Sequence, residues 1–157
     1  MSLDKTWYTE EWAGQGSAIS LKIKDKVHDE QSPYQRIEIY ETETFGTLMT
    51  LDGLVMVTDR DNFVYHEMMS HPALFTHPDP KRVLTIGGGD CGTLHEVPKH
   101  QSVELAEQVE LDERVTRQAL EQPRHLLVVL DLERRQPAVG AARQAQAGAE
   151  EESRREG

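Results

Sequence analysis

The sequence predicts an α/β protein in which a small N-terminal antiparallel β-sheet domain precedes the first part of a doubly wound parallel sheet. The first observation is that apolar and polar residues alternate over residues 17–58, with the period of half-buried strands. The second is that, from Arg82 onward, an apolar run, a glycine cluster, a helix-compatible segment and another apolar run follow one another. This order predicts the β-loop-α-β unit from which parallel sheets are built.

The antiparallel sheet is predicted from two alternating segments and one turn. The apolar members of these segments are Ile19, Leu21, Ile23, Ile37, Ile39 and Phe45. Asp52-Gly53 stands between the apolar runs TLMTL and LVMV. An Asp-Gly pair in that position is a strong signal for a two-residue β-hairpin.

A helix is predicted to follow, because Phe63, Met68 and Leu74 lie near helical spacing and Asn62 or its neighbour could cap the start. Pro72 is expected to kink or split this helix, since proline removes a backbone donor. The turn-rich segment THPDPKR that comes next is the best candidate for a domain boundary.

The parallel unit is predicted to contain strands at residues 82–86 and 103–111. Between them we expect a short helix from about Thr93, which Pro98 should end early. A second helix is expected from Asp112, and the apolar run at residues 124–132 would form a third strand.

After Leu132 the sequence contains mainly Ala, Arg, Gln, Glu and Gly, which predicts disorder or a frayed helix. The predicted division of the chain is therefore a β-rich domain, a helix with a linker, a partial nucleoside-binding domain and a tail. These segments cover residues 1–60, 61–80, 81–131 and 132–157.

Composition argues against several classes of function. The formal net charge of −11 does not suit binding to nucleic-acid phosphates. The single cysteine, Cys91, excludes an internal disulfide framework and a cysteine-rich zinc site. The N-terminus is polar and acidic and no apolar run approaches the length of a membrane span, so we expect a cytoplasmic protein with no membrane partner.

The stretch GGGDCG follows the first strand of the parallel unit. Gly87, Gly89 and Gly92 fit the G-x-G-x-x-G pattern, with Gly88 inside it, and Glu110 follows 18 residues after Gly92. Such glycines let the backbone approach a nucleoside, and an acid in this position accepts hydrogen bonds from ribose hydroxyls. The alternative is a tight turn between strand and helix, with Glu110 facing solvent.

Asp90 inside the glycine cluster discriminates among ligands. A pyrophosphate would be attracted to a helix N-terminus but repelled by a carboxylate in the same loop. A ligand with a ribose, a positive charge and no phosphate fits better, and S-adenosyl sulfonium compounds have that character. The alternative role for Asp90 is to cap the following helix.

The segment YHEMMSH suggests a metal site, but the spacing of His66 and His71 argues against a zinc protease. Five residues rotate the second histidine by about 140° around a helix, away from the first. The remaining histidines are expected to be scattered surface residues, and Cys91 is expected to be a small buried thiol without an activating base. We therefore predict no metal and no bound cofactor.

Three segments closely resemble the polyamine aminopropyltransferase family, which includes the spermidine synthases. They are SPYQRIEIYET, FGTLMTLDGLVMVTDRDNFVYHEMMSHPALFTHPDPKRVLTIGGGDCGTLHEV and VELDERV. The resemblance runs from about Trp7 to Gln118 and implies an N-terminal β-strand domain followed by a Rossmann-like, methyltransferase-type domain. It also implies a homodimer or homotetramer assembled through the N-terminal region.

The resemblance implies two cationic substrates and no metal. The donor would be decarboxylated S-adenosylmethionine, and the acceptor would be putrescine. The acceptor amine attacks the carbon beside the sulfonium, the aminopropyl group is transferred, and methylthioadenosine leaves. The family's enzymes therefore orient both partners with carboxylates and remove one proton from the amine.

The resemblance also assigns binding roles to individual residues. Gln35 lies in the family's substrate-binding YQ motif, and Tyr65 and His66 match the pair that lines the putrescine and aminopropyl region. Asp90 matches the acid that binds the donor's amine, and Glu110 matches the ribose-binding acid. From the residues alone, Tyr65 would be an ordinary core aromatic and Gln35 an exposed strand residue.

The chain also departs from the family. Cys91 replaces a glycine of the family loop GGGDGG, which would strain the backbone by about 1 kcal/mol or more if that position requires a positive φ. Pro98 replaces a helix-compatible residue, at a cost of about 3 kcal/mol if it is interior. The loop that carries the family's general base has no match, so no catalytic residue is assigned, and Asp131 is not promoted to that role.

Three interpretations follow. The first is an aminopropyltransferase whose catalytic half is missing, so that this chain alone would have negligible activity. From Asp112 onward every basic residue except His125 is Arg, and the resemblance ends near Gln118. Our hypothesis is a disrupted reading frame in a GC-rich gene, which resequencing would test. The alternatives are a non-catalytic oligomerisation or binding module derived from the family, and an S-adenosylmethionine-dependent methyltransferase-like protein.

Overall fold

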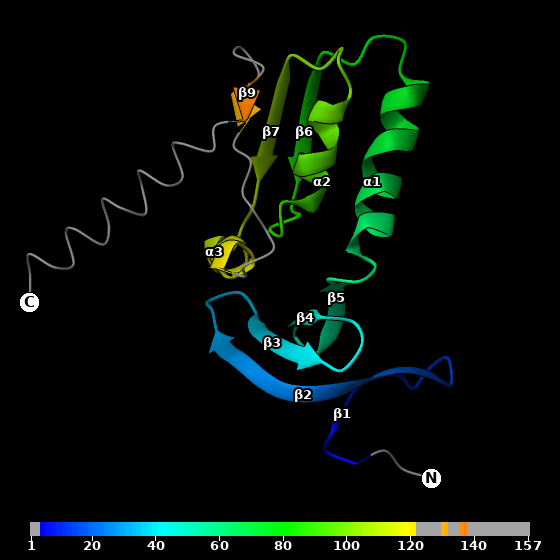
Figure 1. Cartoon of the computed structure of the whole chain (residues 1–157), viewed down its shortest axis with the longest axis vertical. Coiled ribbons are helices and arrows are strands. Elements are labelled where there is room, and N and C mark those ends of the chain that lie inside the picture. The colour runs from blue at the N-terminus through cyan, green and yellow to red at the C-terminus, as the bar shows by residue number, and fades with distance from the viewer. Residues whose placement is uncertain (1–3, 122–129, 132–135, 138–157) are drawn as a thin grey trace, which may run out of the picture. The chain divides into compact units, whose positions relative to one another are not determined.

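The chain forms two compact units, Met1–Met68 and Met69–Gly157. The computed structural model describes residues 4–121, 130–131 and 136–137 (Figure 1). No described helix is long and apolar enough to cross a lipid bilayer. The predicted domain boundaries at residues 60, 80 and 131 stay predictions.

The first unit contains a five-stranded antiparallel sheet in which each strand pairs with its neighbour in sequence (Figure 1). Its strands are β1 Trp7–Trp12, β2 Ser17–Gln31, β3 Arg36–Thr42, β4 Thr47–Leu51 and β5 Leu54–Thr58. The predicted antiparallel sheet is confirmed, but the sequence did not predict β1. That strand turns Glu10 inward, where its carboxylate accepts a hydrogen bond of 2.6 Å from the Val55 amide.

The core of the first unit is built from the alternating residues of the central strands. Leu21, Tyr40 and Leu48 form a buried cluster, because β2, β3 and β4 each present one of them to the same face. Ile37 and Ile39 are fully buried as well. Removing these side chains from water is the main contribution to the stability of such a sheet.

Two turns have the backbone that their residues predict. Asp52 and Gly53 have φ values of 50° and 78°, so both central residues of the β4–β5 hairpin are left-handed, as a type I′ turn requires. Gly46, between β3 and β4, also has a positive φ of 72°, and a Cβ there would lie 2.6 Å from the Cβ of Asp59. Glycine is therefore required at Gly46 on both counts.

Helix α1, Asn62–Thr76, connects the two units. It continues through Pro72 as one helix, so the prediction that proline splits it is wrong. In the last turn, the Thr76 hydroxyl donates a hydrogen bond of 2.6 Å to the Pro72 carbonyl. The Thr76 side chain thus bonds back to the carbonyl four residues earlier, a common arrangement for threonine in helices.

The second unit contains the predicted parallel strands. They are β6 Arg82–Ile86 and β7 Leu105–Val109, with Val83 opposite Ala106 and Ile86 opposite Val109. Between them, helix α2 Gly92–Glu96 passes into the 3₁₀ turn η1 Val97–Lys99, so the prediction that Pro98 ends the helix early is confirmed. Helix α3, Glu113–Glu121, follows β7.

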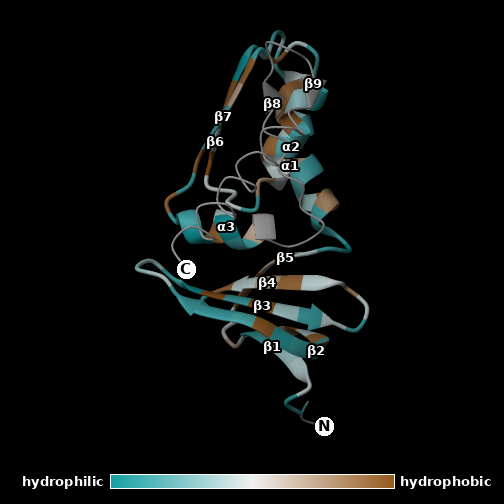
Figure 2. Cartoon of the chain, turned by 60° about the vertical axis from the view of Figure 1, so that its left-hand side comes forward, coloured by the Kyte–Doolittle hydropathy of each residue, from teal (hydrophilic) through white to brown (hydrophobic). Residues whose placement is uncertain are grey.

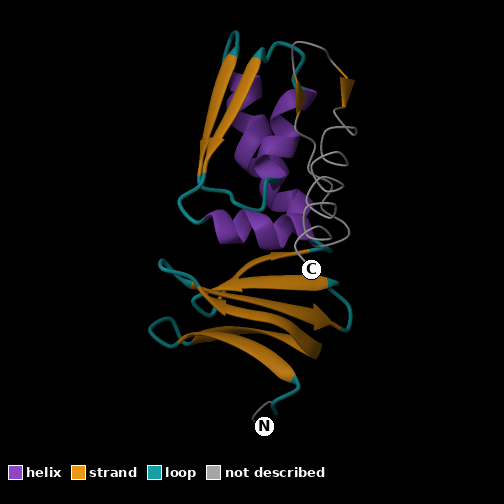
Figure 3. Cartoon of the chain, turned by 90° about the vertical axis from the view of Figure 1, so that its left-hand side faces the viewer, coloured by secondary structure: helices purple, strands orange, loops and turns teal. Residues whose placement is uncertain are grey.

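A small core joins these elements. Leu74 of α1, Val97 of η1 and Val103 are buried together, and Val83 and Ala106 of the two strands pack against them. Helices α1 and α2 lie over one face of the β6–β7 sheet (Figure 3). The antiparallel sheet followed by the start of a Rossmann-like parallel sheet confirms the predicted fold class.

The predicted third strand, residues 124–132, falls mostly outside the described residues. Its described part, β8 Leu130–Asp131, pairs antiparallel with β9 Gln136–Pro137. The predicted disordered tail over residues 132–157 likewise lies outside the described residues, apart from β9.

Candidate functional site

The glycine loop, residues Gly87–Gly92, connects the carboxyl end of β6 to α2. Gly87 and Gly88 have φ values of 80° and 70°, which side chains disfavour. The Gly87 amide donates a hydrogen bond of 2.8 Å to the carbonyl of Val109, the last residue of β7. The loop is thereby held at the carboxyl edge of the parallel sheet, where nucleotides bind in folds of this kind.

Gly89 is the point of closest approach in this loop. A Cβ on Gly89 would lie 2.9 Å from Cγ1 of Val115 on α3 and 3.0 Å from Oε2 of Glu110. The loop backbone therefore lies directly against the carboxylate that follows β7. A side chain at Gly89 would displace Glu110 or α3.

Glu110 is held in a defined position by the start of α3. Its Oε1 accepts a hydrogen bond of 3.0 Å from the Asp112 amide, while its Oε2 faces Gly89. Asp112 is buried and caps α3 by accepting a hydrogen bond of 3.1 Å from the Arg114 amide. The turn from β7 into α3 thus fixes the acid beside the glycine loop.

Cys91 occupies the N-cap position of α2. Its φ of 63° and ψ of 5° are left-handed, and its side chain makes no capping hydrogen bond. The N-cap position itself is thus Cys91, one residue after Asp90, and the alternative role of Asp90 as a cap stays a prediction. The departure from glycine at Cys91 falls at a position with a positive φ, so the expected strain of about 1 kcal/mol applies.

The Cys91 thiol is half-buried and has weak partners. It lies 3.6 Å from the Gly89 carbonyl and accepts a contact of 3.7 Å from Nε2 of Gln108. Burial raises the pKa of the Cys91 thiol; the Gln108 contact opposes this shift, and the charges of Asp90 and Glu110 add to it. The thiol is therefore a poor nucleophile, because only the thiolate attacks.

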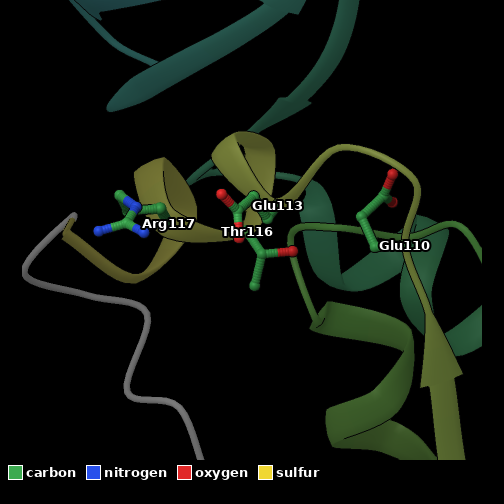
Figure 4. A pocket seen from close by; sticks show the side chains of 4 residues that line it. All are labelled: Glu110, Glu113, Thr116 and Arg117. Carbon is green, nitrogen blue, oxygen red and sulfur yellow. The ribbon is translucent and has the colours of Figure 1, made fainter. Parts of the chain in front are cut away.

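A cavity of about 440 Å³ opens beside Glu110 (Figure 4). Its lining residues are Glu110, Glu113, Thr116 and Arg117, the last three from α3. The set offers two carboxylates, a hydroxyl and a guanidinium, which can hydrogen-bond sugar hydroxyls. Sequence analysis missed the α3 members, although spacings of three and four residues place them on one helix face.

The remaining predicted site residues lie in the first unit. Gln35 is half-buried in the turn between β2 and β3. Its backbone amide donates a hydrogen bond of 3.0 Å to the Ser32 hydroxyl. Tyr65 and His66 are neighbours on α1, with ring centroids 5.5 Å apart, and Tyr65 is exposed whereas His66 is buried. The structure thus brings Glu110 to the glycine loop that holds Asp90, and Tyr65 to His66.

A polar cluster that the sequence did not predict surrounds Glu96 at the end of α2. The nearly buried carboxylate of Glu96 lies 3.3 Å from Nε2 of His71 and 3.2 Å from Nδ1 of His95, and it pairs with Lys99. Nδ1 of His71 lies 2.9 Å from Nε2 of His100. Histidines and carboxylates can bind metals, but ion pairing already accounts for this arrangement.

Opposing effects set the pKa values in this Glu96 cluster. Burial acts to raise the pKa of Glu96, but Lys99 and His95 together lower it by more, so its net pKa lies below the ordinary value. The pKa of His100 is also lowered, first by burial and then by His71. At neutral pH the cluster therefore holds an ionised Glu96 and a neutral His100.

Two family models match the chain. Residues 6–59 match the spermidine synthase tetramerisation domain, and residues 62–132 match the spermine/spermidine synthase domain. The first match covers the five-stranded sheet. The second covers α1, the parallel strands, the glycine loop and α3.

Curated relatives and solved structures are similar over the same part of the chain. The polyamine aminopropyltransferase of Thioalkalivibrio sulfidiphilus is 67% identical over 119 residues, which are 76% of this chain and 41% of the relative. That of Methylococcus capsulatus is 65% identical over 72% of this chain and 40% of the relative.

Two crystal structures show the same similarity in three dimensions. They are spermidine synthase from Thermotoga maritima and a spermidine synthase in complex with the transition-state analogue AdoDATO. Each is 43% identical, has a TM-score of 0.71, and is matched over 78% of this chain and 43% of its own. The chain thus spans about two fifths of the length of the proteins it matches.

Proposed function

The chain belongs to the spermine/spermidine synthase family, and we propose that its second unit binds decarboxylated S-adenosylmethionine through the glycine loop and Glu110. One observation carries this proposal: Gly89 lacks a side chain where a Cβ would lie 3.0 Å from Oε2 of Glu110. The loop backbone and the acid therefore form one surface at the carboxyl edge of β6 and β7, where a nucleoside fits.

The charges of this surface favour a cationic ligand without phosphate. Glu110 would accept hydrogen bonds from the two ribose hydroxyls, and Asp90 would bind the amine of the aminopropyl group. A pyrophosphate would meet both carboxylates at short range and be repelled. The related spermidine synthase that is 43% identical binds the analogue AdoDATO, which supports an adenosyl ligand here.

For the whole enzyme we propose aminopropyl transfer to putrescine. The acceptor nitrogen forms a bond to the carbon beside the sulfonium, the carbon–sulfur bond breaks, and the electron pair stays on sulfur as neutral methylthioadenosine. The attacking amine loses one proton to a general base. Gln35, Tyr65 and His66 are proposed to contact the acceptor and the aminopropyl chain, whereas no residue of this chain is proposed as the base.

Calorimetry with two ligands tests the proposal for the donor. Methylthioadenosine shares the adenosine part with decarboxylated S-adenosylmethionine but lacks the aminopropyl chain and its terminal amine. Glu110→Gln should weaken binding of both ligands by about 10- to 100-fold, the typical value of a hydrogen bond to a charged group. Asp90→Asn should weaken binding of decarboxylated S-adenosylmethionine alone.

Glu107→Gln is the matched control, because Glu107 lies three residues before Glu110 on β7 with an exposed side chain. It should leave both affinities unchanged. Equal loss of both ligands in Asp90→Asn would contradict the role of Asp90 at the amine. S-adenosylmethionine binding as tightly as its decarboxylated form would favour the methyltransferase-like alternative.

We also propose that the first unit assembles the protein into a homodimer or homotetramer. The observation that favours this role is the match of residues 6–59 to a tetramerisation domain. The five-stranded sheet occupies those residues, and its outer strands β1 and β5 each pair with a single neighbour. Among the described residues these outer edges have no further strand partner, although the Val55 amide of β5 already bonds the Glu10 carboxylate, and strand edges of this kind can pair with another chain.

A further inference from the structure

Gln108 is a polar residue on the face of β7 that the helices cover. Ala106 and Gln108 are half-buried, whereas the residues beside and between them on the strand are exposed. Ala106 packs against the apolar core, so Gln108, two residues later, lies on the same side of the sheet. Figure 2 shows that β6 and β7 carry both hydrophobic and hydrophilic residues. A carboxamide on a covered face requires hydrogen-bond partners, because burying it without them is unfavourable.

The carboxamide of Gln108 is only half satisfied. Its Nε2 lies 3.7 Å from Sγ of Cys91. Its Oε1 is buried and has no hydrogen-bond partner among the described residues. An apolar side chain of the same length, such as methionine, would avoid this unpaired acceptor. The contact with Cys91 is therefore what distinguishes glutamine from an apolar residue at this position.

Two hydrogen bonds in series connect Gln108 to the glycine loop. Sγ of Cys91 accepts from Nε2 of Gln108 and donates to the Gly89 carbonyl at 3.6 Å. A thiol can donate and accept at the same time, so both bonds can coexist. The Cys91 amide donates a hydrogen bond of 2.8 Å to the Gly88 carbonyl, and the Cys91 carbonyl accepts one of 3.0 Å from the His95 amide. Cys91 is therefore held through its backbone and through its side chain.

Asp90 stands between the two loop residues that these bonds hold. Gly89 precedes it and Cys91 follows it, and the thiol connects both of them to Gln108. Gly89 is confined from the other side as well, because a Cβ there would lie 3.0 Å from Oε2 of Glu110. The backbone of Asp90 therefore has little freedom to turn. A binding group that is held before its ligand arrives loses less entropy on binding.

We propose that Gln108 is a positioning residue of the donor site, which holds the backbone on both sides of Asp90 through the Cys91 thiol. In this role Gln108 does not touch the ligand; it orients Asp90 toward the amine of the donor. The inference rests on the proposed binding of decarboxylated S-adenosylmethionine by Asp90. It also gives Cys91 a function, because a glycine at this position would relieve the strain but could not make the contact with Gln108.

Calorimetry with two ligands on the full 157-residue chain tests this role. Gln108→Met keeps the length of the side chain and removes its donor. It should weaken binding of decarboxylated S-adenosylmethionine by about 3- to 10-fold, the value typical of one hydrogen bond. Binding of methylthioadenosine should change little, because this ligand lacks the amine that Asp90 binds. Equal losses for the two ligands, or no loss for the first, would overturn the proposal.

Substitutions at Cys91 show whether Gln108 acts through the thiol. In Cys91→Gly, adding Gln108→Met should have no further effect on the affinity for the donor, because the contact is already absent. In Cys91→Ser, whose hydroxyl can still donate and accept, the effect of Gln108→Met should persist. An effect of the same size in the wild-type, glycine and serine backgrounds would show that Gln108 acts by another route, which refutes the proposal.

Gln101→Met is the matched control, because Gln101 is an exposed glutamine of the same unit, shortly before β7. It should leave both affinities unchanged, and a loss equal to that of Gln108→Met would contradict the proposal. Asp90→Asn separates this inference from the proposed function. If Asp90→Asn leaves donor binding intact, the donor assignment fails and this inference fails with it. If Asp90→Asn weakens donor binding and Gln108→Met does not, only the role of Gln108 fails.

A measurement on the wild-type chain removes any dependence on the folding of a variant. In the nuclear magnetic resonance spectrum, the side-chain amide protons of Gln108 should show a nuclear Overhauser effect to the β protons of Cys91. The effect should persist when decarboxylated S-adenosylmethionine is bound, because the contact holds Asp90 in the bound state as well. Its absence from the free chain, or its loss on binding, would overturn the proposal.

Discussion

Cys91 is the residue at which this chain departs most directly from a glycine loop. It stands at a φ of 63°, between the Gly89 carbonyl and Gln108, and immediately follows Asp90. A non-glycine residue in this conformation is disfavoured by about 1–2 kcal/mol. The half-buried thiol offers only weak contacts in return, so the loop carries strain next to the proposed donor site.

Cys91→Gly should relieve that strain. We expect a free energy of unfolding about 1 kcal/mol higher than that of Cys91→Ala, because the two variants both lack the thiol and differ only in the Cβ at a left-handed position. Urea unfolding at constant pH measures the difference. Equal stability of the two variants would show that the loop tolerates the side chain without strain.

At the level of elements, the contact between α1 and α2 is polar as well as apolar. Leu74 of α1 packs against Val97 of η1, the turn that continues α2, while His71 of α1 lies within 3.3 Å of Glu96 of α2 and contacts the ring of His100. Phe75 adds an edge contact to His100, with ring centroids 4.6 Å apart. The carboxyl end of α2 is therefore held by an ionised Glu96 and by histidine side chains. The protonation of these groups should affect the stability of the fold.

Stability should fall as the pH is lowered through this cluster. The pKa of His100 is below its ordinary value of 6.5 in the folded state, so the unfolded chain binds more protons and stability is lost below about pH 6.5. The lowered pKa of Glu96 acts with the same sign, and its contribution is lost at lower pH, below its ordinary 4.5. Thermal melting from pH 8 to pH 5 should follow the first loss.

His100→Gln is the variant that isolates this effect. Its melting temperature should change less between pH 7.5 and pH 5.5 than that of the wild-type chain, because glutamine does not titrate. The other histidines are present in both proteins and cancel in the comparison. Identical pH profiles for variant and wild type would remove His100 from the explanation.

For the whole molecule, the two units match two different family models. The first matches a tetramerisation domain, and the second carries the glycine loop and the acid after β7. The chain spans about 41% of the first curated relative, and the family's base-containing loop has no match among its 157 residues. Donor binding and assembly are therefore the functions proposed for this chain, rather than the transfer step.

An assay of the purified chain tests whether it binds and assembles without carrying out the transfer step. With putrescine and decarboxylated S-adenosylmethionine, we expect no methylthioadenosine release above the uncatalysed background, because no residue of the chain is proposed to take the amine's proton. Light scattering of the same sample should give a multiple of 17.8 kDa. Turnover at a rate typical of enzymes, or a strict monomer at all concentrations, would contradict the respective expectation.

Much of the fold could be predicted because its signals are local. Alternation identified β3, the Asp52-Gly53 pair identified the hairpin, and Pro98 identified the end of α2. Strand β1 escaped because an inward-facing Glu10 hides its pattern, and its burial depends on an amide 45 residues away in β5. Pro72 does not split α1, which continues from Asn62 to Thr76, whereas a kink at Pro72 stays a prediction.

By itself, the sequence determined the family resemblance, the order of the elements, and the identity of the residues around the glycine loop, because these depend on residue type and short-range spacing. Only the tertiary structure decided that Gly89 lies against Glu110, that Cys91 is left-handed, and that Glu96 gathers His71, His95 and Lys99. Such contacts depend on how distant segments pack, and no local periodicity encodes that packing.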